Sequence, residues 1–156
     1  GYINQKGGIA RGGEFSVKAK ATVSMDLFAS YTFTNSGQLT PQVSGSGVLK
    51  TLGVPEHQFT LVATQRFNRA WVNFDFLATS SYLAPIFSNS SFNTYIYRFR
   101  GNRRGDLTTG YTFGLKREKL TVRLYGTIEN VFDQEYFENG FNTAKRTGRV
   151  GLTFGF

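Results

Sequence analysis

Cysteine is absent from these 156 residues, histidine occurs once and proline occurs three times. Without cysteine the chain can form neither a disulfide scaffold nor a thiolate metal site. Because His57 is the only histidine, a histidine metal cluster or a Ser-His-Asp triad has one candidate and no visible partners. The sequence therefore predicts a protein that is not an enzyme and that holds no metal or cofactor.

Long apolar runs are missing as well. No window approaches the ~20 apolar residues that a membrane-spanning helix needs, and no charged and then apolar signal peptide follows Gly1. The chain starts abruptly in polar residues, at positions 1–8, which is more typical of the inside of a loop than of a natural start. We therefore expect the chain to be a fragment of something longer.

Aromatic residues and glycine are plentiful instead, with sixteen Phe, eight Tyr and eighteen Gly. This composition suits β-structure with tight turns rather than disorder. The formal net charge is +8, which fits nucleic acid, anionic lipid or an anionic ligand as a partner. The positions of the charges along the predicted strands must decide among these partners.

Strict two-residue alternation is the dominant pattern, and it is the period of a strand with two unlike faces. In the segment 58–67, for example, Phe59 and Leu61 alternate with Gln58 and Thr60. The pattern predicts seven antiparallel strands, at residues 14–20, 27–34, 58–67, 71–82, 106–116, 120–129 and 149–156. The predicted fold class is therefore all-β.

The connections alternate between short and long. Short turns are predicted near residues 22–26, 68–69 and 117–119, and long polar loops at 35–55, 84–103 and 131–146. Transmembrane β-barrels have short periplasmic turns, longer extracellular loops, an apolar outer face and a polar interior. The sequence thus predicts an antiparallel transmembrane barrel wall, with Phe156 periplasmic. In the alternative, a soluble β-sandwich or lipocalin-like barrel, the apolar face would have to form one core.

Four short motifs resemble segments of TonB-dependent outer-membrane receptors. Residues 130–137 read Asn-Val-Phe-Asp-Gln-Glu-Tyr-Phe, which looks like the N-[LV]-F-D-x-x-Y segment just before the last strand of that family. Gly140 and the Arg-Thr-Gly-Arg segment 146–149 follow, where the family opens its last strand. Residues 53–59 resemble the family's P-x-H start of a barrel strand, and residues 10–15 resemble its R-G-x-E opening.

The resemblance implies a 22-stranded barrel plugged by an N-terminal domain. Residues 1–156 would be its C-terminal part, with about seven strands and without the plug. The parent receptor would lie in the bacterial outer membrane and take up a scarce small-molecule ligand: a ferric siderophore, haem, cobalamin or an oligosaccharide. The TonB complex would supply energy through the absent plug. An open sheet edge in lipid costs several kcal/mol per unpaired backbone group, so the remaining strands must come from outside this chain.

The last eight residues resemble the β-signal that the outer-membrane assembly machinery reads. The matching positions are Arg149, Gly151, Phe154 and Phe156. An edge strand with an apolar stripe and an exposed ladder can be captured by strand addition. The resemblance implies contact with the assembly machinery, and it implies that Phe156 is a true C-terminus.

A basic cluster with interleaved aromatics is the candidate binding site. Its members are Arg98, Arg100, Arg103, Arg104, Tyr95 and Tyr97. Arginine pairs well with phosphate and carboxylate, so the functional interpretation is an extracellular site for lipopolysaccharide phosphates or an anionic ligand. The alternative is a solvated strand extension of mixed charge. Nucleic acid needs the same ingredients but is not the predicted partner.

Cations on the polar face form a second group, consisting of Lys18, Lys20, Arg66, Arg123 and Arg149. We expect them to pair across strands with the carboxylates Glu14, Asp75, Asp106 and Glu129. The other interpretation is that they tune the electrostatics of the barrel interior.

A different class of function stays open beside the receptor. The chain could form a small self-contained outer-membrane barrel that acts as an adhesin or a structural protein. This hypothesis needs an eighth strand from residues 2–10, and that segment alternates poorly.

Overall fold

The computed structural model describes residues 7–38, 49–115, 120–138 and 141–156, and this part of the chain contains strands and no helix. The strands are β1 (Ile9–Thr22), β2 (Met25–Gln38), β3 (Leu49–Lys50), β4 (His57–Phe67), β5 (Ala70–Thr79), β6 (Tyr82–Ser88), β7 (Asn93–Phe99), β8 (Arg103–Leu115), β9 (Leu120–Glu129), β10 (Phe137–Glu138), β11 (Phe141–Asn142) and β12 (Thr147–Gly155). Among the described residues, no helix is long and apolar enough to cross a membrane.

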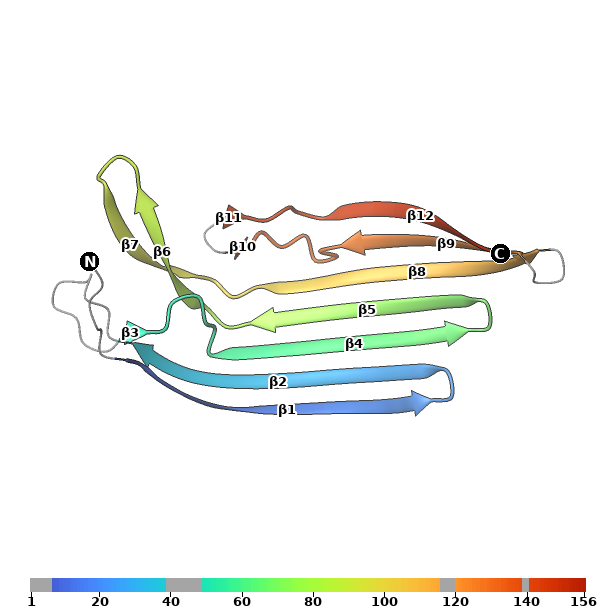
Figure 1. Cartoon of the computed structure of the whole chain (residues 1–156), viewed down its shortest axis with the longest axis horizontal. Coiled ribbons are helices and arrows are strands. Elements are labelled where there is room, and N and C mark those ends of the chain that lie inside the picture. Colours follow the sequence, from blue (N-terminus) through green and yellow to red (C-terminus); the bar gives the residue numbers. More distant parts are fainter. Residues whose placement is uncertain (1–6, 39–48, 116–119, 139–140) are drawn as a thin grey trace.

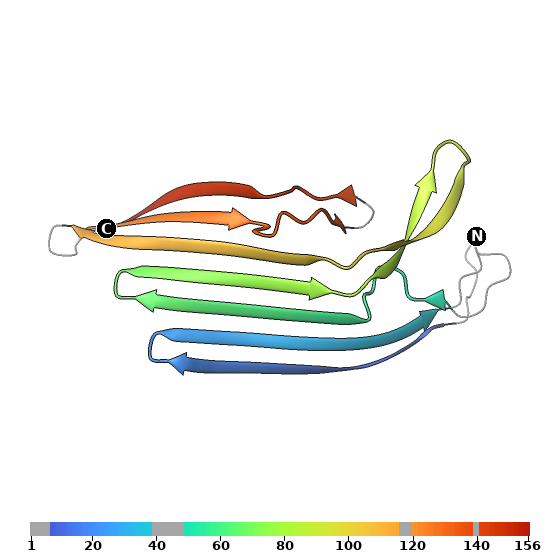
Figure 2. The ribbon, with the colours of Figure 1, turned by 180° about the vertical axis from the view of Figure 1, so that it is seen from behind.

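The main sheet has the strand order β1-β2-β4-β5-β8-β9-β12, and the short β3 pairs with β2. Figures 1 and 2 show a single layer of long antiparallel strands, with β1 at one edge and β12 at the other. The all-β antiparallel fold is therefore confirmed. The sheet is open, so closure into a 22-stranded barrel stays a prediction.

A strand of the main sheet lies at each of the seven predicted positions, and several are longer than the alternation indicated. The strand predicted at 71–82 is shorter, because β5 ends at Thr79 and Tyr82 begins β6 in the separate hairpin sheet. β1 already starts at Ile9, because the arginine and glycines before residue 14 interrupt the pattern without ending the strand. The turns predicted at 22–26 and 68–69 are tight connections, since Thr22 pairs with Met25 and Phe67 with Ala70. The turn predicted at 117–119 lies outside the described residues.

Two predicted long loops contain hairpins that the sequence analysis missed. β6 and β7 pair along their whole lengths, so most of the predicted loop 84–103 is a hairpin. Aromatics at every second position of β7 carried that signal, but Pro85 in β6 concealed the partner strand, because proline cannot donate to a ladder. β10 and β11 form a shorter hairpin within the predicted loop 131–146. Much of the loop 35–55 lies outside the described residues.

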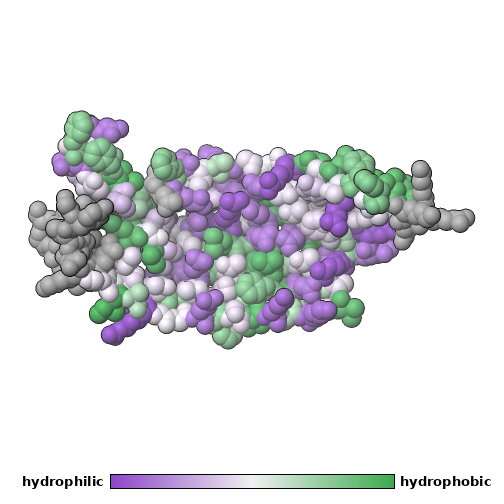
Figure 3. Space-filling view, viewed as in Figure 1, coloured by the Kyte–Doolittle hydropathy of each residue, from purple (hydrophilic) through white to green (hydrophobic). Residues whose placement is uncertain are grey.

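The strand register sorts the side chains onto two faces. Directly paired residues of an antiparallel ladder share a face, and Phe15, Tyr31 and Phe59 are successive partners across β1, β2 and β4. The apolar face also carries Val17, Leu27, Leu61, Phe74, Phe76, Leu107, Phe113, Val122, Leu124, Val150, Leu152 and Phe154. The polar face carries Lys18, Asp26, Arg66, Trp71, Asp75, Arg104, Asp106, Arg123, Glu129 and Arg149. On the side seen in Figure 3, hydrophilic side chains are spread along the whole length of the strands.

No second layer covers the apolar face. Phe15 is 68%, Leu152 59% and Phe154 61% exposed. In the described part of the chain, Ala84 and Tyr136 are the only buried hydrophobic residues, so the sheet encloses no core. Soluble proteins rarely leave so large an apolar surface in water. The single-layer sheet therefore lacks the core that a soluble β-sandwich would need.

Two glycines on the polar face make room for large aromatic rings on the neighbouring strand. Trp71 of β5 pairs with Gly110 of β8, and Tyr125 of β9 pairs with Gly151 of β12. A Cβ atom added at Gly110 would lie 2.7 Å from Nε1 of Trp71, and one at Gly151 would lie 2.3 Å from Cζ of Tyr125. Each ring therefore lies directly over the opposing glycine and holds the register there.

The substitution Gly110→Ala should lower the free energy of unfolding by about 1–3 kcal/mol, the usual cost of overpacking. The added methyl group collides with the Trp71 indole, which must leave its position. Urea titration of the full-length protein in detergent measures the change. Gly126→Ala is the matched control, because the nearest atom to an added Cβ there is 3.9 Å away. Equal stability of the two variants would contradict this interpretation.

Candidate functional site

Residues 130–137, which resemble the receptor motif before the last strand, begin with a tight turn directly after β9. Asn130 is 2% exposed and has a φ of 53°, a left-handed conformation that asparagine tolerates better than most residues. Its Nδ2 donates to the carbonyl of Gln134 at 2.9 Å and to that of Ala144 at 3.5 Å. Its Oδ1 accepts from the backbone N–H of Gln134 at 3.1 Å. One buried amide thus closes the turn and ties it to the segment before β12.

Other members of the motif attach this turn to the sheet. The ring of Phe132 packs edge-on against Phe76 with centroids 5.9 Å apart, and it covers Gly105, where an added Cβ would lie 2.6 Å from the ring. Oδ1 of Asp133 accepts from the backbone N–H of Arg146 at 2.9 Å. We call residues 130–136 the clasp, because they join β8 and β9 to the start of β12. These contacts give Asn130, Phe132 and Asp133 of the motif a structural role.

An ionic network lies on the polar face beside the clasp. The Arg104 guanidinium donates to Asp106 at 2.9 Å and to the buried Tyr136 hydroxyl at 3.1 Å. Glu129 lies 3.9 Å from Arg104 and forms an ion pair with Arg149 at 2.5 Å. The backbone N–H of Asn130 also donates to Asp106, at 2.8 Å.

The expected pairing of inward cations is confirmed only in part. Arg149 pairs with Glu129 as predicted, whereas Arg66 pairs with Asp26 at 2.5 Å, a carboxylate that the sequence analysis did not name. Among the described residues, no ion pair within 4 Å joins Lys18, Lys20 or Arg123 to a carboxylate. Asp26 is the second residue of β2 and lay within the predicted turn 22–26, so its inward position depended on where that turn ends.

The predicted basic cluster is divided among separate places. Arg103 and Arg104 are consecutive in β8 and therefore point to opposite faces, Arg103 opposite Ala78 and Arg104 into the ionic network. Arg98 lies in the β6–β7 hairpin and lines a small cavity of about 80 Å³ with Lys50 and Glu56. Arg100 follows the end of β7. Proximity in sequence suggested one site, but strand alternation separates its members.

Tyr95 and Tyr97 stay together on one face of the β6–β7 hairpin. Tyr97 pairs with Ala84 and is 55% exposed, and Tyr95 is 46% exposed. Figures 1 and 2 show this hairpin projecting from the end of the sheet that lies opposite the short turns. Phe87 and Phe92 lie near its tip, 55% and 79% exposed. The hairpin thus presents an aromatic surface beyond the sheet.

The base of the hairpin is fixed by an aromatic cluster. Tyr82 stacks on Phe99 with centroids 5.6 Å apart, and Phe99 lies 5.5 Å from Phe137 of β10. The Tyr82 hydroxyl donates to the carbonyl of Phe137 at 2.6 Å. Burial, together with the nearby charge of Glu138, raises the pKa of the Tyr82 hydroxyl, which keeps it protonated as a donor.

The segment that leads into β4 carries the P-x-H motif of residues 53–59. Nδ1 of His57 lies 2.7 Å from the Tyr31 hydroxyl, and its ring is 5.3 Å from that of Phe33. Lys50 forms an ion pair with Glu56, and this hydrogen bond lowers the pKa of the Glu56 carboxyl. Within the described residues, no group of three or more His, Cys, Asp or Glu side chains is arranged to hold a metal ion.

No protein-family model matches this chain. The iron-regulated outer membrane virulence protein of Vibrio cholerae serotype O1 is 28% identical over 151 residues, which cover 93% of this chain and 21% of that protein. The chain thus spans about a fifth of the length of the relatives it matches.

Solved structures of outer-membrane receptors share the fold. The ferripyoverdine receptor of Pseudomonas aeruginosa superposes with a TM-score of 0.67 at 17% identity, over 94% of this chain and 19% of that one. The siderophore receptor PiuA of Acinetobacter baumannii gives a TM-score of 0.68 at 15% identity, over 94% and 22%. The sheet therefore has the fold of an outer-membrane receptor barrel wall.

These neighbours are transport receptors rather than enzymes. The resemblance to TonB-dependent receptors that the four motifs indicated is confirmed by the neighbours.

The substitution Asn130→Ala should destabilise the protein by about 1–3 kcal/mol, because it leaves buried backbone groups without partners. The temperature at which the heat-modifiable band of the full-length protein disappears on a gel measures this loss. Asn142→Ala is the control, since that exposed amide makes a side-chain bond to Glu135 in the short β10–β11 hairpin. If both variants melt together, the clasp does not hold the last strands.

Proposed function

We propose that this chain is the C-terminal part of the barrel wall of an outer-membrane receptor, which takes up a scarce ligand with energy supplied through TonB. The observation that carries the proposal is the single-layer sheet, whose apolar face is bare while its other face carries most of the charges. Such a sheet is stable where lipid covers one face and a polar barrel interior lies behind the other. Its two open edges are where further strands would continue the barrel.

The proposed orientation rests on the connections. The tight turns after β1 and β4 lie at one end of the sheet, together with the end of β12, and the β6–β7 hairpin lies at the other (Figure 1). Barrels of this kind keep short turns periplasmic and long loops extracellular. The clasp and the hairpin would then face outward from the cell, and residue 156 would be periplasmic.

The proposed ligand is a ferric siderophore. The similar structures are receptors for ferripyoverdine and another siderophore, and the similar Vibrio protein is described as iron-regulated. Haem, cobalamin or an oligosaccharide are the other ligands that the family resemblance implies. Tyr95 and Tyr97 on the hairpin would contribute flat apolar surface to an extracellular binding site, with Arg98 on the opposite hairpin face.

Partners follow from the same placement. No strand of the described part of the chain pairs with the outer side of β12, which suits capture by the assembly machinery through strand addition. In that signal Phe154 and Phe156 would face lipid, whereas Arg149 and Gly151 lie on the polar face. Outer-membrane lipid and lipopolysaccharide would cover the apolar face. TonB would act through the plug domain, which is not part of these 156 residues.

A self-contained adhesin-like barrel is less well supported. It needs a separate strand from residues 2–10, but Ile9 and Ala10 already belong to β1, and residues 1–6 lie outside the described part of the chain. The main sheet is open rather than closed. A compact, protease-resistant monomer of this chain alone, refolded in detergent, would favour the adhesin-like barrel over a receptor fragment.

Uptake of radioactive iron tests the proposal. Cells that carry the full-length gene should accumulate iron from at least one of a panel of ferric siderophores, and cells without it should not. Replacing both Tyr95 and Tyr97 by Ala should reduce uptake at least tenfold, because two aromatic contacts are lost. Thr94→Ala on the opposite hairpin face is the control and should keep uptake within twofold. Unchanged uptake in the tyrosine variant would exclude the hairpin from the binding site.

A further inference from the structure

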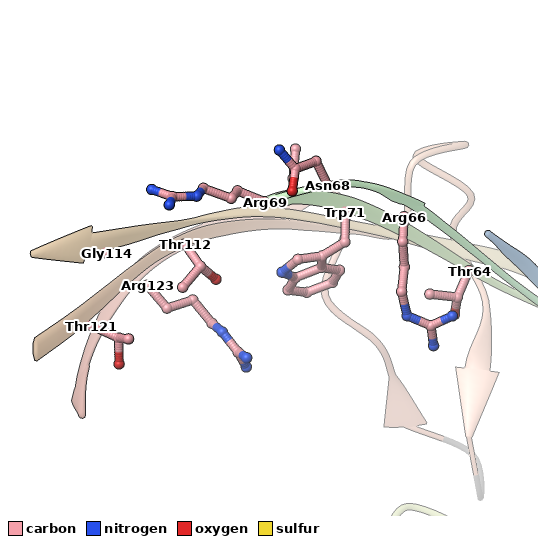
Figure 4. A pocket seen from close by; sticks show the side chains of 10 residues that line it. Thr64, Arg66, Asn68, Arg69, Trp71, Thr112, Gly114, Thr121 and Arg123 are labelled. Atoms are coloured by element: carbon pink, nitrogen blue, oxygen red, sulfur yellow. The ribbon is translucent and has the colours of Figure 1, made fainter. Parts of the chain in front are cut away.

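A pocket on the polar face, near the short turns, has no part in the proposed ligand contact at the hairpin. It has a volume of about 580 Å³ and is lined by residues of β4, β5, β8, β9 and the β4–β5 turn. In Figure 4 the side chains of Arg66, Trp71 and Arg123 extend to the same, concave side of the sheet, from β4, β5 and β9. Three strands thus bring two cations and an indole to one hollow.

Arg66 and Arg123 differ in their partners. The Arg66 guanidinium forms an ion pair with Asp26 at 2.5 Å, and both side chains are partly exposed. Arg123 is exposed and has no hydrogen bond or ion pair to any described residue. Its neighbours across the ladder are the neutral Thr112 and Thr153. The pocket therefore contains a guanidinium with all its donors available.

Charge along the polar face is uneven. Near the hairpin end, Arg104 and Arg149 are matched by Asp106 and Glu129 in the ionic network. Nearer the short turns, the described polar face carries the cations Lys20, Arg66 and Arg123 and the carboxylate Asp26, whereas Lys18 lies in the same ladder row as Asp75. Among the described residues, none that lines the pocket is a carboxylate. This end of the face consequently has an excess of positive charge.

The floor of the pocket is mostly neutral. Trp71 lies over Gly110, where an added Cβ would be 2.7 Å from its Nε1, so the indole sits directly on the backbone of β8. Thr64, Thr112 and Thr121 also line the pocket. The Thr64 hydroxyl donates to Asn73 at 2.6 Å and the Thr121 hydroxyl to the carbonyl of Gly155 at 3.5 Å, so Thr112 offers the available hydroxyl. Hydroxyl groups can donate to an anion without opposing its charge.

We propose that the pocket around Arg123, Arg66 and Trp71 binds an oxyanion, namely a carboxylate or a phosphate. A guanidinium presents a planar pair of donors that matches either group. The oxyanion comes from one of two sources: a small soluble anion, or an acidic side chain of a part of the same protein outside these 156 residues. The inference rests on the proposed function only in identifying the polar face as the barrel interior.

Fluorine NMR of the full-length protein labelled with 5-fluorotryptophan tests binding, with the Trp71 signal assigned by its loss in Trp71→Phe. Citrate and inorganic phosphate are titrated separately. A saturable shift of the Trp71 signal that weakens at least tenfold in Arg123→Gln, and less than threefold in Arg123→Lys, supports a site for a soluble anion. Lys18→Gln is the matched control, because it removes one positive charge from the same face outside the pocket.

The second source is tested by zero-length crosslinking of Arg123→Lys with a carbodiimide, which joins an amine to a carboxylate in contact with it. A crosslink, identified by mass spectrometry, to an acidic residue outside residues 1–156 supports an internal carboxylate as the occupant. The proposal is overturned by a crosslink to Asp26, by an anion response that Arg123→Gln leaves unchanged, or by the absence of both binding and crosslink. Neither readout depends on transport, so failure of iron uptake with intact anion binding would refute the transport function alone.

Discussion

Hydrogen bonding between the backbones of neighbouring strands holds this molecule together. Only a few side chains of the described residues are buried, so packing contributes less than in a soluble domain of similar size. The ladder instead runs through every neighbouring pair from β1 to β12. In lipid each unpaired backbone group costs several kcal/mol. The sheet, and every site on it, therefore depends on complete hydrogen bonding between neighbouring strands.

Register follows from that condition. If one strand shifted by one residue, each of its side chains would move to the opposite face of the sheet. Its apolar side chains would then lie on the polar face, and its charged side chains on the apolar face. Aromatic rings over Gly110 and Gly151 oppose such a shift, because each ring fits only where the neighbouring strand has no side chain. The clasp does the same at the hairpin end by tying β8, β9 and β12 together around Asn130. Backbone pairing and these local locks therefore support one another.

Function is distributed according to the same geometry. The hairpin end exposes aromatics such as Tyr97 beyond the sheet, and its polar face is nearly charge-balanced. The short-turn end has excess positive charge around Arg123. A single strand can thus contribute to two chemically different surfaces, since the ladder fixes both the face and the height of each side chain.

Much of this architecture could be predicted from the sequence. The seven long strands, their two unlike faces and two of the tight turns follow from alternation with a period of two, which is a property of the chain itself. The motif at 130–137 indicated the class of fold, and the likeness to outer-membrane receptors agrees with it. The β6–β7 hairpin was not predicted, because Pro85 lacks a backbone N–H and so argued against a strand at β6.

The tertiary structure alone decided which residues meet. Arg103 and Arg104 are neighbours in sequence but lie on opposite faces, whereas Arg66 reaches Asp26 from forty residues away. The open pocket at Arg123 likewise depends on strands β4, β5, β8 and β9 lying side by side. Alternation along one strand fixes the face of a side chain, but only pairing between strands fixes its neighbours. The sequence by itself therefore determined the strands and their two faces, and the pairing between strands determined which side chains form each site.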